Sequence, residues 1–307
     1  MQNSIPSKMA NCFIFLNIYD RISTISMAYS IDGKKLSEEI LESLKSEVLL
    51  LKKQGIIPKL SVILVGADKP SKTYIKRKEE AAHIVGVEFQ LHTYPADTSK
   101  EKIISEIKKI QKEKNLSGLI VQLPLPEPLF TTEVLNAVDE ERDVDCFTDA
   151  QLGKLVMKTN TISPPTPGAV CDILESIDVE VKGKHIVIVG AGALVGKPLA
   201  IMLLNKQATV TVCNEHTRNL KSITRTADIL VSAVGEKNLI TKSHIKKGAV
   251  VIDTGICFVD GKMYGDVDFK GASKRASYIT PVPGGVGPVT VALLLKNTVT
   301  QAKRKLL

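Results

Sequence analysis

The sequence has no tryptophan, only 4% aromatic residues and five cysteines in 307 residues. The cysteines, at positions 12, 146, 171, 213 and 257, form no CxxC pair, which argues against a zinc site. Their small, odd number excludes a disulfide scaffold, and it is typical of a reducing, cytoplasmic compartment. No apolar run approaches the roughly 18 residues of a membrane helix. We therefore expect a cytoplasmic protein with no bound metal and no membrane association.

The charge balance is basic, with 41 Lys and Arg against 33 Asp and Glu, a net charge of +8. Such an excess attracts anions, but the lysines mostly alternate with glutamates, as in residues 100–114, which is typical of solvated helix faces. Basic residues are not interleaved with aromatic ones, so we expect no nucleic-acid partner. The 44% apolar content excludes a disordered chain, and the length allows two ordinary domains.

Residues 1–26 differ from the rest of the chain. An apolar patch, Asn11–Tyr19, follows a single Lys8. The weak basic start and the lack of a clear cleavage site make a poor signal peptide. Because Met27 begins a stretch of ordinary composition, we interpret residues 1–26 as an upstream extension.

The chain then alternates between helical and strand patterns. Apolar residues at 3–4 spacing predict a helix over residues 33–54. Short runs rich in β-branched residues predict strands at 60–65, 87–94 and 118–123, with helices at 71–85 and 99–114 between them. This alternation predicts a parallel sheet with right-handed crossovers.

A proline-rich segment, Ser163–Gly168, is predicted to stop both helix and strand, and we place a domain boundary there. Beyond it the alternation restarts. Strands are predicted at 185–189, 209–213, 229–234, 249–252 and 278–280, with helices from about 196 and over 289–305. The sequence therefore predicts an α/β protein with two domains.

A glycine-rich turn, Gly190–Gly196, follows a predicted strand and opens a predicted helix. Glycines there let the backbone approach a pyrophosphate at a helix N-terminus, although similar turns also occur for packing alone. Glu215 lies at the end of the next strand, 19 residues after Gly196. It is either the acid that binds a ribose 2′-OH and repels a 2′-phosphate, or a surface turn residue.

Four further positions carry groups suited to chemistry. Tyr74 and Lys78 share a helix face, where tyrosine can stack on a ring and a desolvated lysine can lose its proton near neutral pH. Gln122 ends a predicted strand, where ligands bind in α/β sheets. Asp143 and Asp145 alternate by two and can face one side of the chain. Each also has a purely structural explanation, as a solvated pair or a turn cap.

A second cluster of glycine and proline, Pro281–Pro288, lies between a strand and the last helix. A loop of this composition has a fixed shape and brings backbone close to a ligand, or simply makes a tight connection. Physical reasoning alone assigns it no function.

Together these segments resemble the bifunctional methylenetetrahydrofolate dehydrogenase/methenyltetrahydrofolate cyclohydrolase family, the FolD type, from about Ser30 to the C-terminus. The matching motifs are YIKRK (74–78), GLIVQLPLP (118–126), RDVD (142–145), PPTP (164–167), VGKP (195–198), TGI (254–256) and TPVPGGVGP (280–288). The resemblance implies two α/β domains flanking a cleft, the second a Rossmann-type dinucleotide-binding domain, and a homodimer.

The resemblance divides the chain after the extension. It implies a folate-binding catalytic domain over 27–165 and a Rossmann NAD(P)-binding domain over 166–283, while 284–307 form a folate-side loop and a helix returning to the first domain. The implied reactions are oxidation of 5,10-methylenetetrahydrofolate with NAD(P), then hydrolysis of the methenyl product to 10-formyltetrahydrofolate.

The resemblance also implies residue roles. Lys78 matches the catalytic lysine, Gln122 the residue that tunes it, Asp145 the carboxylate that holds the pterin, and Tyr74 the ring that stacks on folate. The other implied substrate-binding residues are Val121, Leu123, Pro283, Gly284, Gly285, Val286, Gly287 and Pro288. The implied cofactor-binding residues are Gly190, Ala191, Gly192, Val195, Gly196, Glu215 and Ile256.

Two departures from the family pattern matter. The family usually has GRS at Gly190–Gly192, and its Arg and a Ser on the next strand contact the NADP 2′-phosphate. This chain has Ala191 and Glu215 at those positions. The resemblance therefore implies NADP, whereas Ala191 and Glu215 favour NAD.

The second departure follows Asp145, where the family pattern DGFHPxNxG is replaced by DCFTDAQLG (145–153). Cys146 stands at a glycine position whose backbone shape it tolerates poorly. Two alternatives stay open: a monofunctional NAD-dependent methylenetetrahydrofolate dehydrogenase, and a non-catalytic folate- or dinucleotide-binding paralogue. The retained Lys78 and Gln122 favour the bifunctional enzyme.

Overall fold

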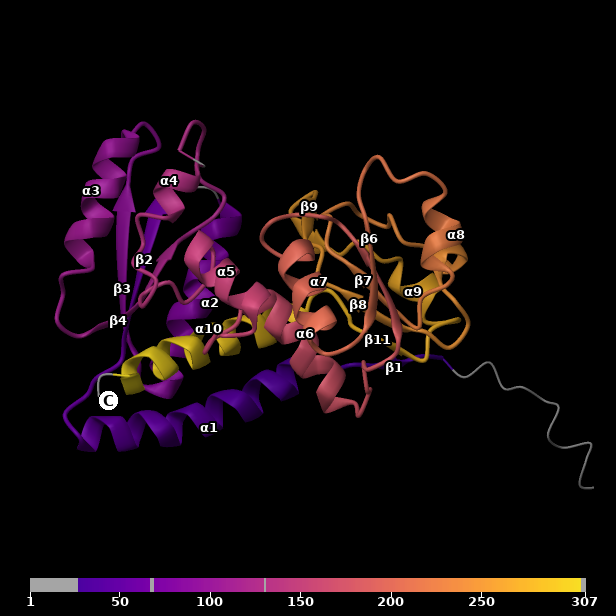
Figure 1. Cartoon of the computed structure of the whole chain (residues 1–307), viewed down its shortest axis with the longest axis horizontal. Coiled ribbons are helices and arrows are strands. Elements are labelled where there is room, and N and C mark those ends of the chain that lie inside the picture. The colour runs from indigo at the N-terminus through magenta and orange to yellow at the C-terminus, as the bar shows by residue number, and fades with distance from the viewer. Residues whose placement is uncertain (1–26, 67–68, 130, 305–307) are drawn as a thin grey trace, which may run out of the picture.

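The computed structural model describes residues 27–66, 69–129 and 131–304. Two parallel sheets stand side by side, with long helices running along them (Figure 1). The predicted α/β class with two sheets is therefore confirmed. The predicted extension, residues 1–26, lies outside the described residues.

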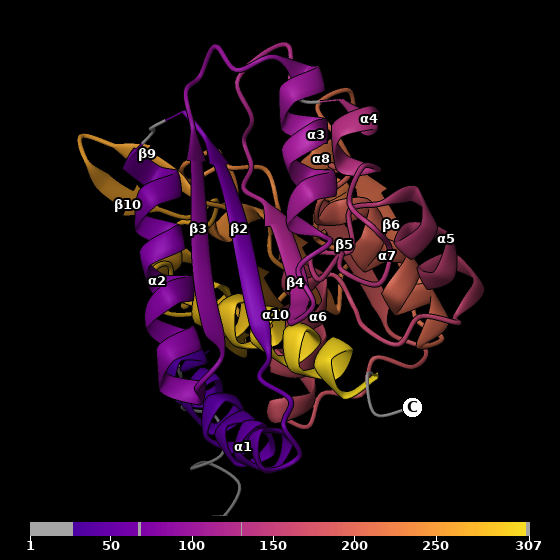
Figure 2. The same cartoon turned by 90° about the vertical axis from the view of Figure 1, so that its left-hand side faces the viewer.

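The first sheet is three-stranded and parallel, in the order β3-β2-β4. Its strands are β2 (Lys59–Val65), β3 (Glu88–Tyr94) and β4 (Leu116–Val121), linked by α2 (Lys69–Val85) and α3 (Lys100–Ile110). The two helices cover opposite faces (Figure 2). Side chains alternate along β2, so that Leu60, Val62 and Leu64 pack on the α2 side, while Ile63 and Val65 pack on the α3 side.

The second sheet is six-stranded and parallel, in the order β1-β11-β8-β7-β5-β6. Its strands are β1 (Tyr29–Ser30), β5 (His185–Val189), β6 (Thr209–Cys213), β7 (Ile229–Ser232), β8 (Val250–Asp253) and β11 (Tyr278–Ile279). The chain passes from β5 to β6 on one side and then to β7 on the other. Ligands bind at the carboxyl ends of strands at such a reversal point. The strand order thus places a ligand site just after β5.

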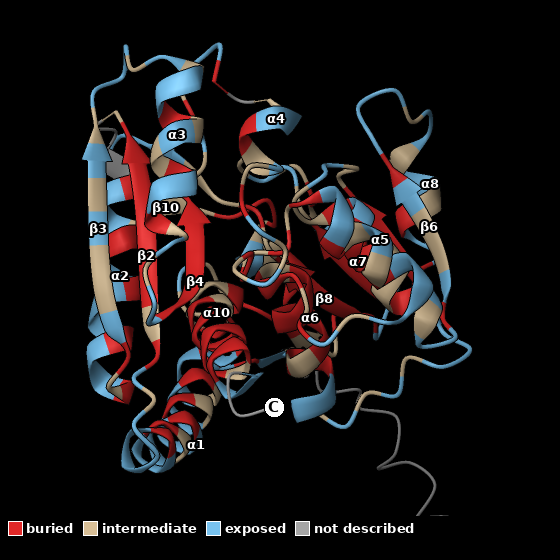
Figure 3. Cartoon of the chain, turned by 60° about the vertical axis from the view of Figure 1, so that its left-hand side comes forward, coloured by how far each residue is buried: buried red, intermediate tan, exposed pale blue. Residues whose placement is uncertain are grey.

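The last helix, α10 (Val286–Lys303), is the centre of the packing between the sheets. It packs on α1 (Gly33–Lys53), α2, β4 and α6 (Pro165–Ser176), and most of its residues are buried (Figure 3). The buried Asn297 amide donates hydrogen bonds to the carbonyls of Val144 (2.9 Å) and Ser163 (2.8 Å). A helix from the end of the chain thereby holds the segment that carries Asp145.

Three expectations about local structure need correction. The proline-rich segment does not stop a helix, because α6 begins at Pro165, where a missing N–H costs nothing in the first turn. The last helix begins at Val286 rather than 289, so Gly287 and Pro288 lie in its first turn. β1 pairs with β11 in the second sheet, although residues 27–165 were assigned to the first domain. The division into domains otherwise stays a prediction.

Several short elements had no strong sequence pattern. They are α4 (Thr132–Leu135), α5 (Asp149–Met157), α8 (Leu220–Thr224), η2 (Lys242–His244), α9 (Phe269–Ala272) and the hairpin β9 (Cys257–Val259) and β10 (Lys262–Tyr264). Within the described ranges, no helix is long and apolar enough to cross a membrane.

We expect Asn297→Ala to lower the free energy of unfolding by about 1–3 kcal/mol, because two carbonyls lose their donor. Urea unfolding measures the change. Thr300→Ala is the control on the same helix: it removes an exposed hydroxyl bonded to the Lys296 carbonyl, and should change stability by less than about 0.5 kcal/mol. Equal effects of the two variants would contradict the role given to Asn297.

Candidate active site

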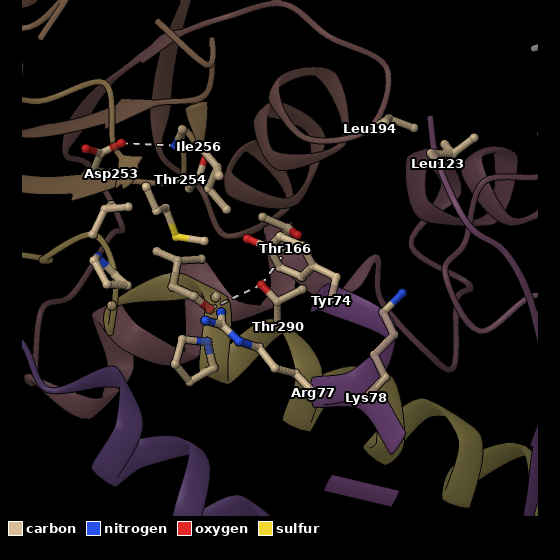
Figure 4. A pocket seen from close by; sticks show the side chains of 18 of the residues that line it. Tyr74, Arg77, Lys78, Leu123, Thr166, Leu194, Asp253, Thr254, Ile256 and Thr290 are labelled. Carbon is tan, nitrogen blue, oxygen red and sulfur yellow. Dashed lines mark hydrogen bonds between the residues drawn. The ribbon is translucent and has the colours of Figure 1, made fainter. Parts of the chain in front are cut away.

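A cavity of about 620 Å³ lies between the two sheets (Figure 4). It is lined by α2, by the loops after β4 and β8, and by the segment leading into α10. Of the predicted site residues, the cavity brings together Tyr74, Lys78, Gln122, Leu123, Asp145, Ile256, Pro283, Gly284, Gly285, Val286, Gly287 and Pro288. Residues distant in the sequence thus meet in one cavity.

The fold explains why α2 and Gln122 meet. The neighbours of β2 in the sheet are β3 on one side and β4 on the other, so its carboxyl end is a reversal point like the one after β5. On β4, Ile120 packs on the α2 side of the sheet and Val121 on the α3 side. The alternation continues to Gln122, which therefore faces Lys78 of α2.

Lys78 and Gln122 form the central contact of the site. The buried Lys78 Nζ donates to Gln122 Oε1 at 3.0 Å. Gln122 Nε2 donates to the Leu123 carbonyl at 2.7 Å, which turns the amide oxygen toward the lysine. Burial lowers the pKa of Lys78, and the charge of Asp145 opposes this shift. The amine is thereby moved toward its neutral form.

The two neighbouring aspartates have different positions. Burial raises the pKa of Asp145, Lys78 lowers it and Asp143 raises it, and Asp145 lines the cavity. Asp143 instead accepts a hydrogen bond from the Thr148 backbone N–H at 2.8 Å and is not among the described lining residues. Asp145 is therefore the carboxylate available to a ligand, and Asp143 has a structural role.

Cys146, which stands where the family pattern has glycine, adopts the backbone conformation that favours glycine. Its φ is 59°, in the left-handed region where a side chain is strained. The next residues that depart from the family pattern form the start of α5. Thr148 is the N-cap of this helix, and its hydroxyl oxygen accepts a hydrogen bond from the Gln151 N–H at 3.3 Å. The altered segment thus has a local structural explanation of its own.

Tyr74 is half-buried and lines the cavity one helical turn before Lys78. Burial raises the pKa of its phenol, and the charge of Arg77 opposes this. The Arg77 guanidinium lies 5.8 Å from the ring centroid. Its phenol therefore stays neutral at physiological pH, and its position suits stacking.

The glycine-rich segment before α10 is tightly held. A Cβ added at Gly285 would lie 2.6 Å from the Pro281 carbonyl oxygen, and one at Gly33 would lie 1.8 Å from the Gly285 oxygen. Ser37 of α1 also donates to the Pro288 carbonyl at 3.0 Å. Only glycine fits these contacts, so the cavity wall has a fixed shape.

The turn after β5 meets the steric needs of a dinucleotide site. A Cβ at Gly190 would lie 2.2 Å from the Ala233 oxygen, and one at Gly196 1.8 Å from the Gly190 oxygen. A Cβ at Gly192 would meet nothing within 4 Å, so the backbone there is open to a ligand. Leu194, inside the turn, lines the cavity, so the turn adjoins it.

The remaining predicted cofactor residues lie on the same edge of the sheet. The Gly190 N–H donates to the Cys213 carbonyl at 2.9 Å, which places the end of β6 beside the turn. Glu215 follows two residues later, with its side chain 81% exposed and its carboxylate 3.6 Å from His216 Nε2. Of the predicted cofactor residues only Ile256 lines the described cavity.

Val121 was also predicted to bind the substrate, and its side chain faces away from the cavity. Its side chain packs with Leu119, Ile103 and Ile107 in the core on the α3 side, and it is not among the described residues lining the cavity. It follows Ile120 on a strand buried on both faces, where hydrophobicity does not show which side chain faces which side. Binding of the substrate by Val121 therefore stays a prediction, and it would have to use the backbone of this residue.

The sequence interpretation missed several lining residues, notably Thr166, Asp253, Thr254 and Met263. Burial raises the pKa of Asp253 to about 7; the charge of Asp266 adds to the rise, and backbone N–H groups oppose it. Its position at the end of a predicted strand was the available signal. Within the described residues, no group of three or more His, Cys, Asp or Glu side chains is placed to hold a metal.

These features define a class of protein: a two-sheet α/β enzyme with a Rossmann-type NAD(P)-binding region and a buried lysine in the cavity between the sheets. Family models support this class. The catalytic domain of tetrahydrofolate dehydrogenase/cyclohydrolase matches residues 31–145, and its NAD(P)-binding domain matches residues 164–306. The chain belongs to the tetrahydrofolate dehydrogenase/cyclohydrolase family, as the sequence motifs predicted.

Individual relatives support the same family. The bifunctional protein FolD of Nautilia profundicola is 48% identical over 89% of this chain and 96% of its own length. The structure of the bifunctional FolD enzyme from Campylobacter jejuni has a TM-score of 0.88 at 40% identity, covering 91% of this chain and 99% of that one. The Trypanosoma brucei FolD, solved with NADP and an inhibitor, also gives 0.88 at 39% identity over the same shares.

Asp253 predicts a pH dependence of stability. Its pKa is about 7 in the folded protein, above the ordinary 3.8. The folded state therefore binds more protons than the unfolded state between these values, and the free energy of unfolding falls as the pH rises through this window. We expect Asp253→Asn to reduce that fall by up to about 1.4 kcal/mol per pH unit.

Urea unfolding at pH values across the window measures the slope. Asp97→Asn, which removes an exposed carboxylate, is the matched control and should keep the wild-type slope. An unchanged slope in Asp253→Asn would show that this carboxyl group does not titrate in the window.

Proposed function

We propose that this protein oxidises 5,10-methylenetetrahydrofolate with NAD(P) and hydrolyses the methenyl product to 10-formyltetrahydrofolate. The buried Lys78–Gln122 pair carries this proposal, since it lies in a cavity bounded by both the first sheet and the NAD(P)-binding region. A site that only binds ligands would not need an amine whose pKa is lowered by burial.

Binding of the folate uses two side chains that flank the lysine. The half-buried Tyr74 offers a ring face for stacking, which suits the flat pterin or aminobenzoyl group. Asp145 offers an acceptor to the N–H groups of the pterin ring. Together they would hold the one-carbon bridge of the folate near Lys78.

The residues after β5 and β8 fit a dinucleotide, and Gly190, Gly192 and Ile256 would hold it. When bound, the nicotinamide supplies the acceptor for the hydride. The contribution of the protein to that step is orientation, because the cavity walls on both sides are fixed by close-packed glycines.

Hydrolysis needs a proton acceptor and then a donor. Water adds to the methenyl carbon and loses one proton, which leaves a hydroxyl group on that carbon. The carbon–N5 bond then breaks as N5 gains a proton, and the hydroxyl releases its own proton to solvent as it becomes the carbonyl of the formyl group on N10. Lys78 can take the first proton and return it, because burial shifts its amine toward the neutral form. Gln122 holds Nζ without adding a charge that would keep it protonated.

We expect Lys78→Gln to reduce methenyltetrahydrofolate hydrolysis by at least about 100-fold, since positioned acid–base groups contribute on this order. Loss of methenyl absorbance measures the rate. Lys76→Gln is the control, because Lys76 is exposed and lies 3.8 Å from Glu80. Hydrolysis that survives in Lys78→Gln would exclude the lysine as the proton carrier. A wild type that oxidises its substrate but does not hydrolyse the product would support the monofunctional alternative.

We infer a preference for NAD over NADP from Ala191 and Glu215. Ala191 offers no cation to a 2′-phosphate, and the exposed Glu215 carboxylate beside the turn would repel it. The homodimer, the cytoplasmic location and the lack of nucleic-acid and membrane partners are likewise predictions; light scattering tests the first.

We expect the double variant Ala191→Arg, Glu215→Ser to shift the ratio of kcat/KM for NADP over NAD upward by more than about tenfold, a change of ~1.4 kcal/mol. Absorbance assays with 5,10-methylenetetrahydrofolate and each cofactor give the ratio. Glu38→Ser, on the exposed side of α1, should leave the ratio unchanged. A wild-type enzyme that strongly prefers NADP would overturn the inference.

A further inference from the structure

Two buried carboxyl groups beside the cavity have no role in the steps above. Asp253 ends β8 and is 3% exposed, and Asp266, shortly before α9, is 0% exposed. Buried carboxyl groups are costly unless they are hydrogen-bonded. Their partners therefore indicate what they do.

Asp266 accepts hydrogen bonds from a single segment, residues 232–236, which begins with the last residue of β7. The Ser232 hydroxyl (2.7 Å) and the Val234 N–H (2.8 Å) donate to Oδ2. The N–H groups of Gly235 and Glu236 donate to Oδ1, both at 2.8 Å. One carboxylate thus sets the path of the whole segment.

That segment touches the glycine-rich turn. The Ala233 N–H donates to the Val189 carbonyl at 2.7 Å, and the Ala233 oxygen lies 2.2 Å from where a Cβ of Gly190 would be. A shift of the segment would therefore move the backbone against which Gly190 packs. Asp266 is thereby linked to the turn through residues 232–236.

Asp253 holds the next loop in the same way. Its Oδ1 accepts from the N–H groups of Gly255 (3.0 Å) and Asp266 (3.1 Å), and its Oδ2 from that of Val267 (2.9 Å). A Cβ on Gly255 would lie 2.0 Å from Asp266 Oδ1. The two carboxyl groups are thus locked around Gly255, the neighbour of the cavity-lining Ile256.

We propose that Asp266, together with Asp253, is a positioning residue for the cofactor side of the cavity, and that it acts through residues 232–236 on Gly190 and through Gly255 on Ile256. This inference rests on the proposed function. Lys78, Gln122 and Asp145 belong to other elements. Loss of Asp266 should therefore impair the dehydrogenase reaction and spare the cyclohydrolase reaction, which uses no dinucleotide.

The test compares three variants of the full chain. Asp266→Asn replaces the carboxylate with a group of similar shape that loses acceptor capacity. Ser232→Ala keeps the carboxylate and removes one of its donors. Asp268→Asn is the matched control, since Asp268 lies two residues along and caps α9 through the Gly271 N–H at 3.2 Å.

We expect Asp266→Asn to weaken dinucleotide binding at least tenfold, measured as the Kd of NAD and of NADP by calorimetry, and to lower dehydrogenase kcat/KM in parallel. Methenyltetrahydrofolate hydrolysis should stay within twofold of wild type. Ser232→Ala should shift the Kd in the same direction by a smaller factor, and Asp268→Asn should leave all three quantities unchanged.

Equal losses in both activities of a folded Asp266→Asn, or an unchanged Kd, would overturn the proposal. If Asp266→Asn does not fold, Ser232→Ala decides: an unchanged Kd rejects the proposal, and a weaker Kd with intact hydrolysis supports it. A wild-type protein that binds dinucleotide but turns over no folate would instead refute the proposed function, and the Kd comparison would still test the positioning role.

Discussion

The site depends on the removal of one amine from water. Lys78 is buried, and it donates a hydrogen bond to the neutral amide oxygen of Gln122. A carboxylate at that distance would hold the lysine protonated, whereas an amide fixes its place and leaves its charge to be set by burial. Asp145 moderates the effect. The chemistry therefore needs this amine to stay buried at the cavity wall, and the two sheets and α10 together form that wall.

The same requirement explains why α10 packs centrally, against α1, α2, α6 and β4. The first turn of α10 belongs to the cavity wall. Further along the helix, Asn297 holds Val144, the residue before Asp145. A single helix thus fixes both the loop facing the substrate and the carboxylate proposed to bind it. Unfolding of α10 would open the site from two sides at once.

The parts of the fold and of the site that depend on a local sequence pattern could be predicted from the sequence. β-branched runs gave most of the longer strands, and the spacing of Tyr74 and Lys78 placed them on one helix face. Short elements such as α5 depend on a cap and on tertiary packing, so periodicity missed them. The network of Asp266 joins a carboxylate to N–H groups some 30 residues away, a contact without any periodic pattern. The side to which Val121 points could not be predicted, because β4 is buried on both faces.

The folate side and the cofactor side of the site differ in what forms them, and they therefore differ in how readily they tolerate substitution. The folate side relies on buried side chains whose pKa values depend on burial, so substitutions there disturb both stability and chemistry. The cofactor side relies on backbone shape, which buried carboxyl groups are proposed to set from behind. The residue proposed to choose the cofactor, Glu215, is largely exposed. Exposed substitutions alter stability little. Cofactor preference can therefore vary among relatives while Lys78, Gln122 and the fold stay as they are.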